Sequence, residues 1–280
     1  MQIINGTLSS ETSIHANDNR GLNYGDAVFE TLRVQQGKIL FWEDHYFRLM
    51  SAMRIMRMEI PMEFTPEALS AQIQELVEAH ELSAKTAVVK LLVYRKTGGL
   101  YRPEQLEVEY TISLRAIDSP FYTLEESDYE VELYKDHYLS PSLLSTLKTN
   151  NKALQVLGSI YADENDYQNC LVVNTDKQIV EALNGNLFLV KGDRIKTPPI
   201  SSGCLNGIMR KQILKLLLEL PDYLIEEGPV SPFELQKADE MFITNVVQGI
   251  RPVTKYRKKQ YSNTVAKDLI GKLNARVRLS

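Results

Sequence analysis

The sequence predicts a two-lobed protein in which a smaller α+β lobe is followed by a larger lobe of mixed strands and helices. Its 280 residues exceed the size at which one hydrophobic core usually stops growing. Alternating apolar strands joined by hairpins dominate the first part, whereas helices mix with strands afterwards. The stretch 116–120 (AIDSP) ends in proline and interrupts the pattern between them. We therefore expect domains at 1–117 and 118–280.

Apolar spacing predicts the elements of the first lobe. Alternation favours strands, residues at helical spacing favour helices, and Gly and Asn clusters mark the turns. The segment 2–5 is expected to form an edge strand. The predicted strands are 2–5, 27–34, 39–41, 87–94 and 106–114, and the predicted helices are 43–58 and 65–80. Between the last two strands lies a polar loop, 95–103, which contains glycine, arginine and tyrosine.

The second lobe is predicted in the same way. Ser231 followed by proline is typical of a helix N-cap with proline at the first helical position. The predicted strands are 129–135, 170–174, 187–190 and 239–245, and the predicted helices are 153–165, 206–220 and 263–276. We find no internal repeat and no low-complexity segment.

Composition excludes several classes of function. The net charge of −4, with a single basic cluster at 255–259 that favours a solvated turn between strands, argues against nucleic-acid binding. Cys170 and Cys204 lie among apolar residues, which favours buried thiols in a reducing compartment. The first residues do not have the pattern of a signal peptide, and the sequence contains no apolar run of about 18 residues that could cross a membrane. We therefore expect a soluble cytoplasmic protein without a metal site.

One stretch, 179–210, carries the strongest chemical signal. It reads IVEALNGNLFLVKGDRIKTPPISSGCLNGIMR and ends where a helix begins. Gly207 allows a tight turn there, and the free N–H groups of a first helical turn can bind an anion. Most glycines before helices only form turns, so this local pattern does not by itself establish an anion site.

Several motifs together resemble those of one family. The order E-x-L-N-x-N-L-F from Glu181, then T-P-P and N-G-I-M-R, resembles the signature of the fold-type IV pyridoxal-phosphate enzymes, the class IV aminotransferase family. YGDAVFETLRV at 24–34, H-x-x-R-L at 45–49 and LKTNNK at 147–152 are similar to further family segments. The resemblance covers nearly the whole chain. It implies a D-amino-acid aminotransferase-like fold with a barrel-like larger lobe, a small-molecule amino substrate and a homodimer.

Pyridoxal 5'-phosphate requires a lysine and an anion on the pyridine nitrogen. The resemblance assigns the lysine to Lys148 and the anion to Glu181. Without it, Lys148 and Lys152 look like two solvated lysines at a helix start, and a glutamate at a strand end is usually exposed.

The cofactor also requires a phosphate cup. The resemblance implies Arg48, whose planar guanidinium suits phosphate, whereas its position alone favours an ordinary surface arginine. It also implies the helix start, with Gly207, Ile208 and Met209, and a donor from Thr244 or Asn245.

Substrate contacts are predicted less sharply. Tyr24 and Phe29 belong to the similar N-terminal segment. The loop 95–103 can supply Arg95, Tyr101 or Arg102 to a substrate carboxylate, although solvent-exposed loop arginines are an equal interpretation.

The motifs favour the lyase reaction of this family, which forms 4-aminobenzoate and pyruvate from 4-amino-4-deoxychorismate. Two patterns resemble the lyase more than the transaminases: K-x-x-N-K-x-x-Q-V-L from Lys148 and A-D-E-M from Ala238. In addition, Ala153 stands where branched-chain transaminases usually have a tyrosine. Branched-chain or D-amino-acid transamination stays the alternative, and non-catalytic cofactor binding a minor one. Two departures are visible: Leu183 replaces a small residue, and Val246 replaces a hydroxyl residue.

Overall fold

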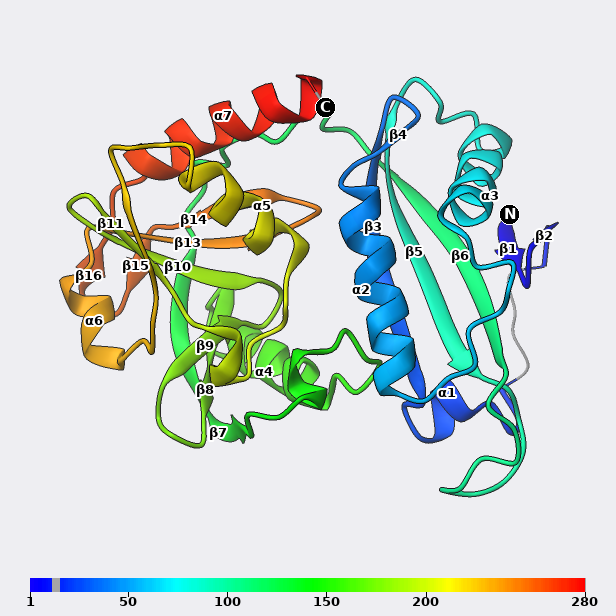
Figure 1. Cartoon of the computed structure of the whole chain (residues 1–280). Helices are drawn as coiled ribbons and strands as arrows, with labels where there is room; N and C mark the ends of the chain where they lie inside the picture. Colours follow the sequence, from blue (N-terminus) through cyan, green and yellow to red (C-terminus); the bar gives the residue numbers. More distant parts are fainter. Residues whose placement is uncertain (12–15, 280) are drawn as a thin grey trace. The chain divides into compact units, whose positions relative to one another are not determined.

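The computed structural model describes residues 1–11 and 16–279 of the chain (Figure 1). It divides into two compact units. Unit 1 comprises residues 1–121 together with the short segment 148–151, and unit 2 comprises 122–147 and the residues from 152 onward. The fold is therefore described one unit at a time.

Unit 1 is built on a six-stranded sheet in which all neighbouring strands are antiparallel, in the order β2-β1-β6-β5-β3-β4. The strand predicted at 2–5 is present as β1, but its predicted edge position is wrong, because β2 pairs outside it and leaves β1 inside the sheet. The strands are β1 Gln2–Ile4, β2 Thr7–Ser9, β3 Ala27–Gln35, β4 Lys38–Ile39, β5 Thr86–Arg95 and β6 Val108–Ile117.

Three helices complete unit 1: α1 Arg20–Asn23, α2 Trp42–Ile55 and α3 Pro66–Ala79. Glu30 pairs with Leu91 and Tyr110 pairs with Val93, so Glu30 and Tyr110 share one face of the sheet. Arg48 of α2 donates a hydrogen bond to Glu30, and the Tyr110 hydroxyl donates to Gln72 of α3 at 3.0 Å. Both long helices therefore cover the same face, and Figure 1 shows α2 running along β3.

Unit 2 contains two five-stranded sheets, in the orders β12-β11-β10-β13-β14 and β16-β15-β7-β8-β9. The strands are β7 Glu130–Leu139, β8 Asn169–Asn174, β9 Ile179–Ala182, β10 Asn186–Lys191, β11 Arg194–Thr197, β12 Leu224–Glu227, β13 Glu240–Asn245, β14 Gly249–Val253, β15 Lys255–Tyr256 and β16 Lys259–Gln260. The helices are α4 Ala153–Glu164, α5 Ile208–Leu217, α6 Pro232–Lys237 and α7 Thr264–Leu279, with 3₁₀ turns at Leu144–Thr146 and Ile200–Ser202.

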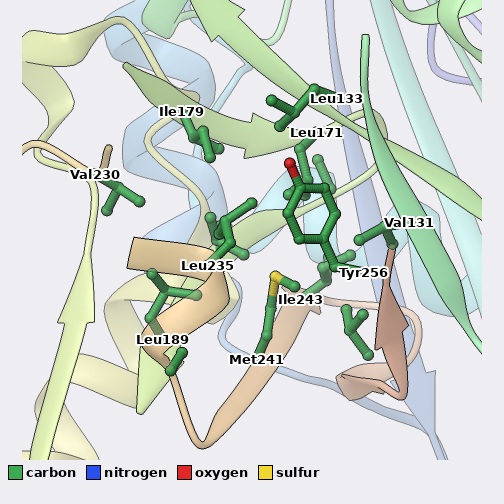
Figure 2. Close-up of a cluster of buried hydrophobic side chains, with 14 of the residues drawn as sticks. Val131, Leu133, Leu171, Ile179, Leu189, Val230, Leu235, Met241, Ile243 and Tyr256 are labelled. Carbon is green, nitrogen blue, oxygen red and sulfur yellow. The ribbon is translucent and has the colours of Figure 1, made fainter. Parts of the chain in front are cut away.

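The two sheets of unit 2 share one apolar core, which gives the barrel-like arrangement. Val131 and Leu171 come from one sheet, and Leu189 and Met241 from the other (Figure 2). Leu235 of α6 packs into the same core. Its helix is capped by Ser231 with proline at the first helical position, as predicted, and Glu234 completes a capping box. Within the described residues no helix is both long and apolar enough to cross a membrane.

Candidate active site

The segment 148–151 is placed in unit 1 by backbone pairing with the open edge of β3. The Phe29 N–H donates to the Lys148 carbonyl at 2.9 Å, and the Asn150 N–H donates to the Ala27 carbonyl at 3.0 Å. Lys148 Nζ lies 4.4 Å from the centroid of the Phe29 ring. The lysine is thus held over an aromatic ring at a sheet edge, where its ammonium interacts with the ring face.

A buried polar triad lies beside this segment on the helix-covered face. Glu30 accepts from Arg48 Nε at 2.7 Å and from Arg48 Nη2 at 2.5 Å. The Nδ1 of His45 is 2.7 Å from the same carboxylate. His45 and Arg48 are three residues apart on α2, so they lie on one face of the helix and meet the same strand residue.

Burial and charge act in opposite directions on this triad. Burial alone raises the pKa of Glu30, but the charge of Arg48 and the hydrogen bonds from His45 and Arg48 outweigh it and lower that pKa to about 2. Burial lowers the pKa of His45, and Glu30 offsets this only in part. His45 is therefore neutral near pH 7, with Nδ1–H donating to Glu30, and its buried Nε2 has no hydrogen-bond partner among the described residues.

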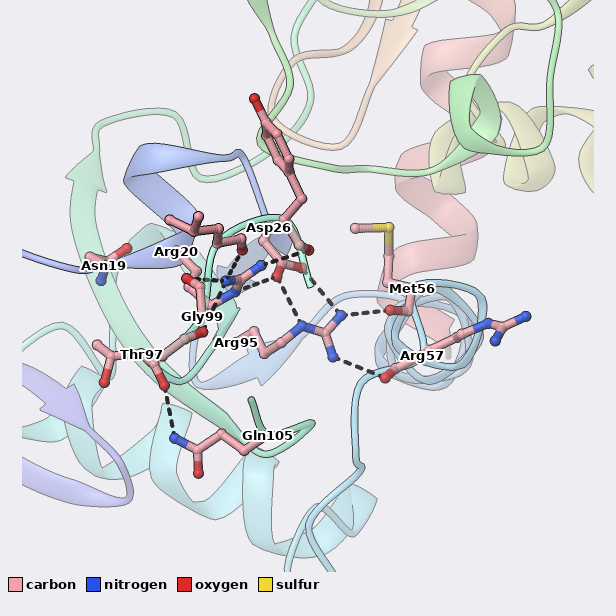
Figure 3. A network of polar contacts seen from close by, with 12 residues as sticks. Asn19, Arg20, Asp26, Met56, Arg57, Arg95, Thr97, Gly99 and Gln105 are labelled. Carbon is pink, nitrogen blue, oxygen red and sulfur yellow. Dashed lines mark hydrogen bonds and ion pairs between the residues drawn. The ribbon is translucent and has the colours of Figure 1, made fainter. Parts of the chain in front are cut away.

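A second network joins two buried arginines to one carboxylate (Figure 3). Asp26 accepts from Arg20 Nε at 3.0 Å and from Arg95 Nε at 2.9 Å. Arg95 also donates to the Met56 and Arg57 carbonyls after α2, at 2.7 and 2.9 Å. Arg95 was expected in the loop, but it is the last residue of β5 and is only 5% exposed.

Arg20 fastens the loop that follows β5. Its guanidinium donates to the carbonyls of residues 98, 99, 100 and 101 at 3.0, 3.1, 2.6 and 3.4 Å. Gly99 turns there at φ 74°, and a Cβ on it would lie 2.2 Å from the Arg102 carbonyl, so only glycine fits. The loop is therefore anchored by its backbone while its side chains stay outside.

A pocket of about 250 Å³ opens beside this network. Tyr24 and the 90%-exposed Tyr101 meet edge to face at its rim, with ring centroids 5.7 Å apart. Arg102 follows on the loop and is exposed, but it does not line the pocket. The lining residues are Arg20, Tyr24, Gly25, Asp26, Met56, Arg95, Tyr101, Pro103 and Asn151.

In unit 2 the buried carboxylate of Glu181 on β9 is tied to the loop before α5. The Leu205 N–H donates to Glu181 Oε2 at 2.8 Å, and Asn186 Nδ2 donates to the Leu205 carbonyl at 2.8 Å. A Cβ on Gly207 would lie 1.9 Å from Asn186 Oδ1. Gly207 is therefore required because the loop passes so close to Asn186.

The start of α5 has the chemistry of an anion site. Its N-cap is Gly207, which has no side chain to cap the N–H groups of Ile208 and Met209, and the first turn holds no acidic residue among those that the structure describes. Thr244, paired with Asn186 on the adjacent strand, is buried, and its hydroxyl lacks a hydrogen-bond partner among the described residues. Uncapped amides and an unpartnered hydroxyl fit a phosphate group.

Other predicted residues have local structural partners. Asn245 Oδ1 accepts from the N–H groups of Val247 and Gln248 at 3.0 and 2.9 Å, which commits its side chain to a turn. Leu183 packs against Gly158, where a Cβ would lie 2.5 Å from its Cδ2. Across residues 1–11 and 16–279, no three His, Cys, Asp or Glu side chains are grouped as metal ligands.

The structure thus gathers most of the predicted residues in three groups, two in unit 1 and one in unit 2. Unit 1 brings together Phe29, Arg48 and Lys148, and separately the loop residues; unit 2 brings together Glu181, Thr244 and the start of α5. Sequence reasoning missed partners that the structure supplies. They are Arg20, Asp26, Glu30, His45 and Asn186. Most of them lie inside the family motifs quoted above, where polar residues interrupt apolar patterns, whereas Arg20 lies outside those motifs.

The antiparallel sheet covered by helices and the second unit of two sheets with a shared core are the architecture of the fold-type IV pyridoxal-phosphate enzymes to which the chain is similar. The chain is similar in fold to the branched-chain amino acid aminotransferase from Thermobaculum terrenum in its PLP form, with a TM-score of 0.83 and 23% identity over 99% of this chain and 93% of that one. The family model for amino-transferase class IV matches residues 27–256. The chain therefore belongs to the class IV aminotransferase family, whose members are PLP-dependent enzymes.

Curated relatives within the family differ in activity. A Methanocaldococcus jannaschii protein provisionally named a branched-chain-amino-acid aminotransferase is 28% identical over 90% of this chain and 86% of its own length. The aminodeoxychorismate lyase of Vibrio harveyi is 25% identical over 84% of each chain. At these identities the comparisons establish the family and leave the reaction to be argued from the residues.

Proposed function

We propose that Lys148, Glu181 and Arg48 are the cofactor residues of this enzyme. Lys148 is the residue that links to the cofactor, Glu181 holds a proton on its pyridine nitrogen, and Arg48 contacts its phosphate. The start of α5, with Gly207, Ile208 and Met209, provides backbone donors, and Thr244 provides a hydroxyl. The uncapped helix and the unpartnered Thr244 hydroxyl support the phosphate assignment. Asn245 takes part only through its backbone, because its side chain is committed to a turn.

When bound, pyridoxal 5'-phosphate supplies an electron sink that acidifies the C–H bond next to the amino group of the substrate. The protein residues then decide where the proton goes. Lys148 Nζ, once released by the incoming amine, is the base that removes this proton. Glu181, whose Oε2 accepts the Leu205 N–H, is the carboxylate proposed to hold the ring nitrogen positive.

We further propose that the reaction is the lyase one, forming 4-aminobenzoate and pyruvate from 4-amino-4-deoxychorismate. Removal of the proton from the carbon bearing nitrogen is followed by breakage of the ether bond on the neighbouring carbon. The ether oxygen leaves with the three-carbon group, which becomes pyruvate, and the ring becomes aromatic. No oxidant is required, since the two products together contain the atoms of the substrate.

The observation that carries this proposal is the lining of the pocket in unit 1. Of its lining residues only Met56 and Pro103 are aliphatic, and Asn151 comes from the same segment as Lys148. A branched aliphatic side chain requires an apolar wall, whereas a ring carrying carboxylates suits a polar and aromatic one. Because Arg95 is buried and committed to Asp26, and Arg102 lies outside the pocket lining, the exposed Tyr101 is the loop residue proposed to meet a substrate carboxylate.

A branched-chain or D-amino-acid aminotransferase is the second candidate. The M. jannaschii relative and the T. terrenum structure support it, since both carry branched-chain aminotransferase names. In that reaction the proton would be added to a carbon of the cofactor, and the product released would be an oxo acid.

We also propose that the enzyme acts as a homodimer, as the family resemblance implies. Val156, Leu157 and Ile160 of α4 are 45–56% exposed and form an apolar stripe on one helix. Sedimentation should give a mass of twice 31.9 kDa. A monomer at micromolar concentration would contradict this.

The first experiment offers enzymatically prepared 4-amino-4-deoxychorismate to the cofactor-loaded protein and follows 4-aminobenzoate and pyruvate. We expect both products in equal amounts, and none with Lys148→Ala. If the loaded protein gives neither product, the lyase proposal fails, and branched-chain and D-amino acids with 2-oxoglutarate are tested next.

The cofactor assignment has its own test. The purified protein should show a visible absorption band that survives dialysis and is absent in Lys148→Ala, whereas Lys152→Ala, on the neighbouring lysine, should keep it. A band that persists in Lys148→Ala would remove this lysine from the site.

A further inference from the structure

We propose that Glu30 and His45 are positioning residues that orient Arg48 toward the phosphate of the cofactor. This inference rests on the proposed role of Arg48. It adds two buried residues that do not themselves touch the cofactor, and it predicts that they control selectivity for a phosphorylated ligand.

Glu30 and the Arg48 guanidinium form a bidentate pair. Glu30 occupies the edge of the Arg48 guanidinium formed by Nε and Nη2, at 2.7 and 2.5 Å. A bidentate pair fixes both the position and the plane of the guanidinium. The Nη1 end therefore has one defined direction, set by a carboxylate on a strand rather than by the flexible arginine stem.

His45 in turn fixes the Glu30 carboxylate. His45 Nδ1 lies 2.7 Å from Glu30 Oε2, so that oxygen receives two hydrogen bonds and the other receives one. Glu30 and His45 are 2% and 0% exposed, so both side chains are shielded from solvent. A ligand-holding group supported by such locked neighbours is preorganised.

Glu30 and Arg48 carry opposite charges, which has two consequences for phosphate binding. Glu30 offsets the positive charge of Arg48, which by itself would weaken attraction for a phosphate. The same charge holds the guanidinium in one orientation, which strengthens binding by removing the cost of ordering a long side chain. The two effects predict opposite results for removal of the Glu30 charge, and the bidentate geometry favours the orienting effect.

The experiment compares the affinities of the apoprotein for pyridoxal 5'-phosphate and for pyridoxal, measured by spectroscopic titration. The phosphate preference is the dissociation constant for pyridoxal divided by that for pyridoxal 5'-phosphate. This ratio reports the phosphate contact alone, because the ring contacts are the same for both ligands. Glu30→Gln should lower this ratio by about 10- to 100-fold, the range of a charge-assisted hydrogen bond. A ratio that stays constant or rises would overturn the inference.

A matched pair at the second residue keeps the test falsifiable if Glu30→Gln does not fold. His45→Asn retains an amide donor near the position of Nδ1 and should keep most of the phosphate preference, whereas His45→Leu should lose it. Met53→Ala, a buried core change on the same helix, should lower the melting temperature without changing the ratio. Equal loss in all three variants would mean that the triad has only a structural role.

Arg48→Ala separates this inference from the proposed function. If it leaves the ratio unchanged, the phosphate role of Arg48 itself is wrong. If it lowers the ratio while Glu30→Gln and His45→Leu do not, Arg48 holds the phosphate without needing its two partners.

Discussion

Asp26→Ala tests whether one carboxylate holds the two arginines that anchor the loop 95–103 of unit 1. Asp26 is 12% exposed and is the shared acceptor for two guanidiniums that are 3% and 5% exposed. Removing one partner of a buried ion pair typically costs about 3–5 kcal/mol. The backbone carbonyls that also accept from Arg20 and Arg95 remain in place, so we expect the lower limit, about 3 kcal/mol.

The measurement is thermal and urea unfolding of the full chain. A loss of about 3 kcal/mol should lower the melting temperature by roughly 6–12 °C. The control is Asp268→Ala, which removes an exposed pair with Lys272 on α7 and should change stability by less than about 0.5 kcal/mol. If Asp26→Ala costs no more than Asp268→Ala, the two arginines do not depend on this carboxylate and the account of the loop anchor is wrong.

Three further predictions concern the cofactor cup, the triad and the thiols. Gly207→Ala places a Cβ 1.9 Å from Asn186 Oδ1 and should weaken cofactor affinity by more than about 10-fold, whereas Gly271→Ala, whose Cβ meets nothing within 4 Å, should bind the cofactor normally. The pKa of Glu30 is lowered from 4.5 to about 2, so its ionisation stabilises the fold above pH 4.5, and this stabilisation is lost as the pH falls toward 2. In Glu30→Gln, the free energy of unfolding measured with urea should therefore fall less steeply between pH 5 and pH 3 than in the unsubstituted protein. Burial raises the pKa values of Cys170 and Cys204 to about 11 and about 12, so a thiol reagent at pH 8 should label neither until the protein unfolds, and rapid labelling of the native protein would contradict their placement.

The elements of both units could be predicted from the sequence because their apolar periodicity is strong. The strand predicted at 27–34 and the helix predicted at 65–80 agree with β3 and α3 to within a residue. Arg95 was misplaced because an arginine beside glycines is typical of a loop. Only the fold brings Asp26 close enough to bury it.

The candidate site was predicted through family motifs rather than from physical pattern. No local feature distinguishes Lys148 from other lysines, and its position depends on pairing with a strand far away in the sequence. The partners of Arg48 were missed for the same reason: Glu30 alternates into an apolar face, where sequence pattern favours a hydrophobic residue. Long-range pairs of this kind leave no periodic signal.

The pairing of 148–151 with β3 also constrains the order of events during synthesis. Val28 and its partner Thr149 are separated by about 120 residues, a loop that closes slowly although its length adds little to the entropy cost. Until those residues leave the ribosome, this part of the β3 edge has unpaired backbone groups that can template association with another chain. A truncation before Lys148 therefore removes the proposed reactive lysine and also leaves this part of the β3 edge unpaired and prone to association.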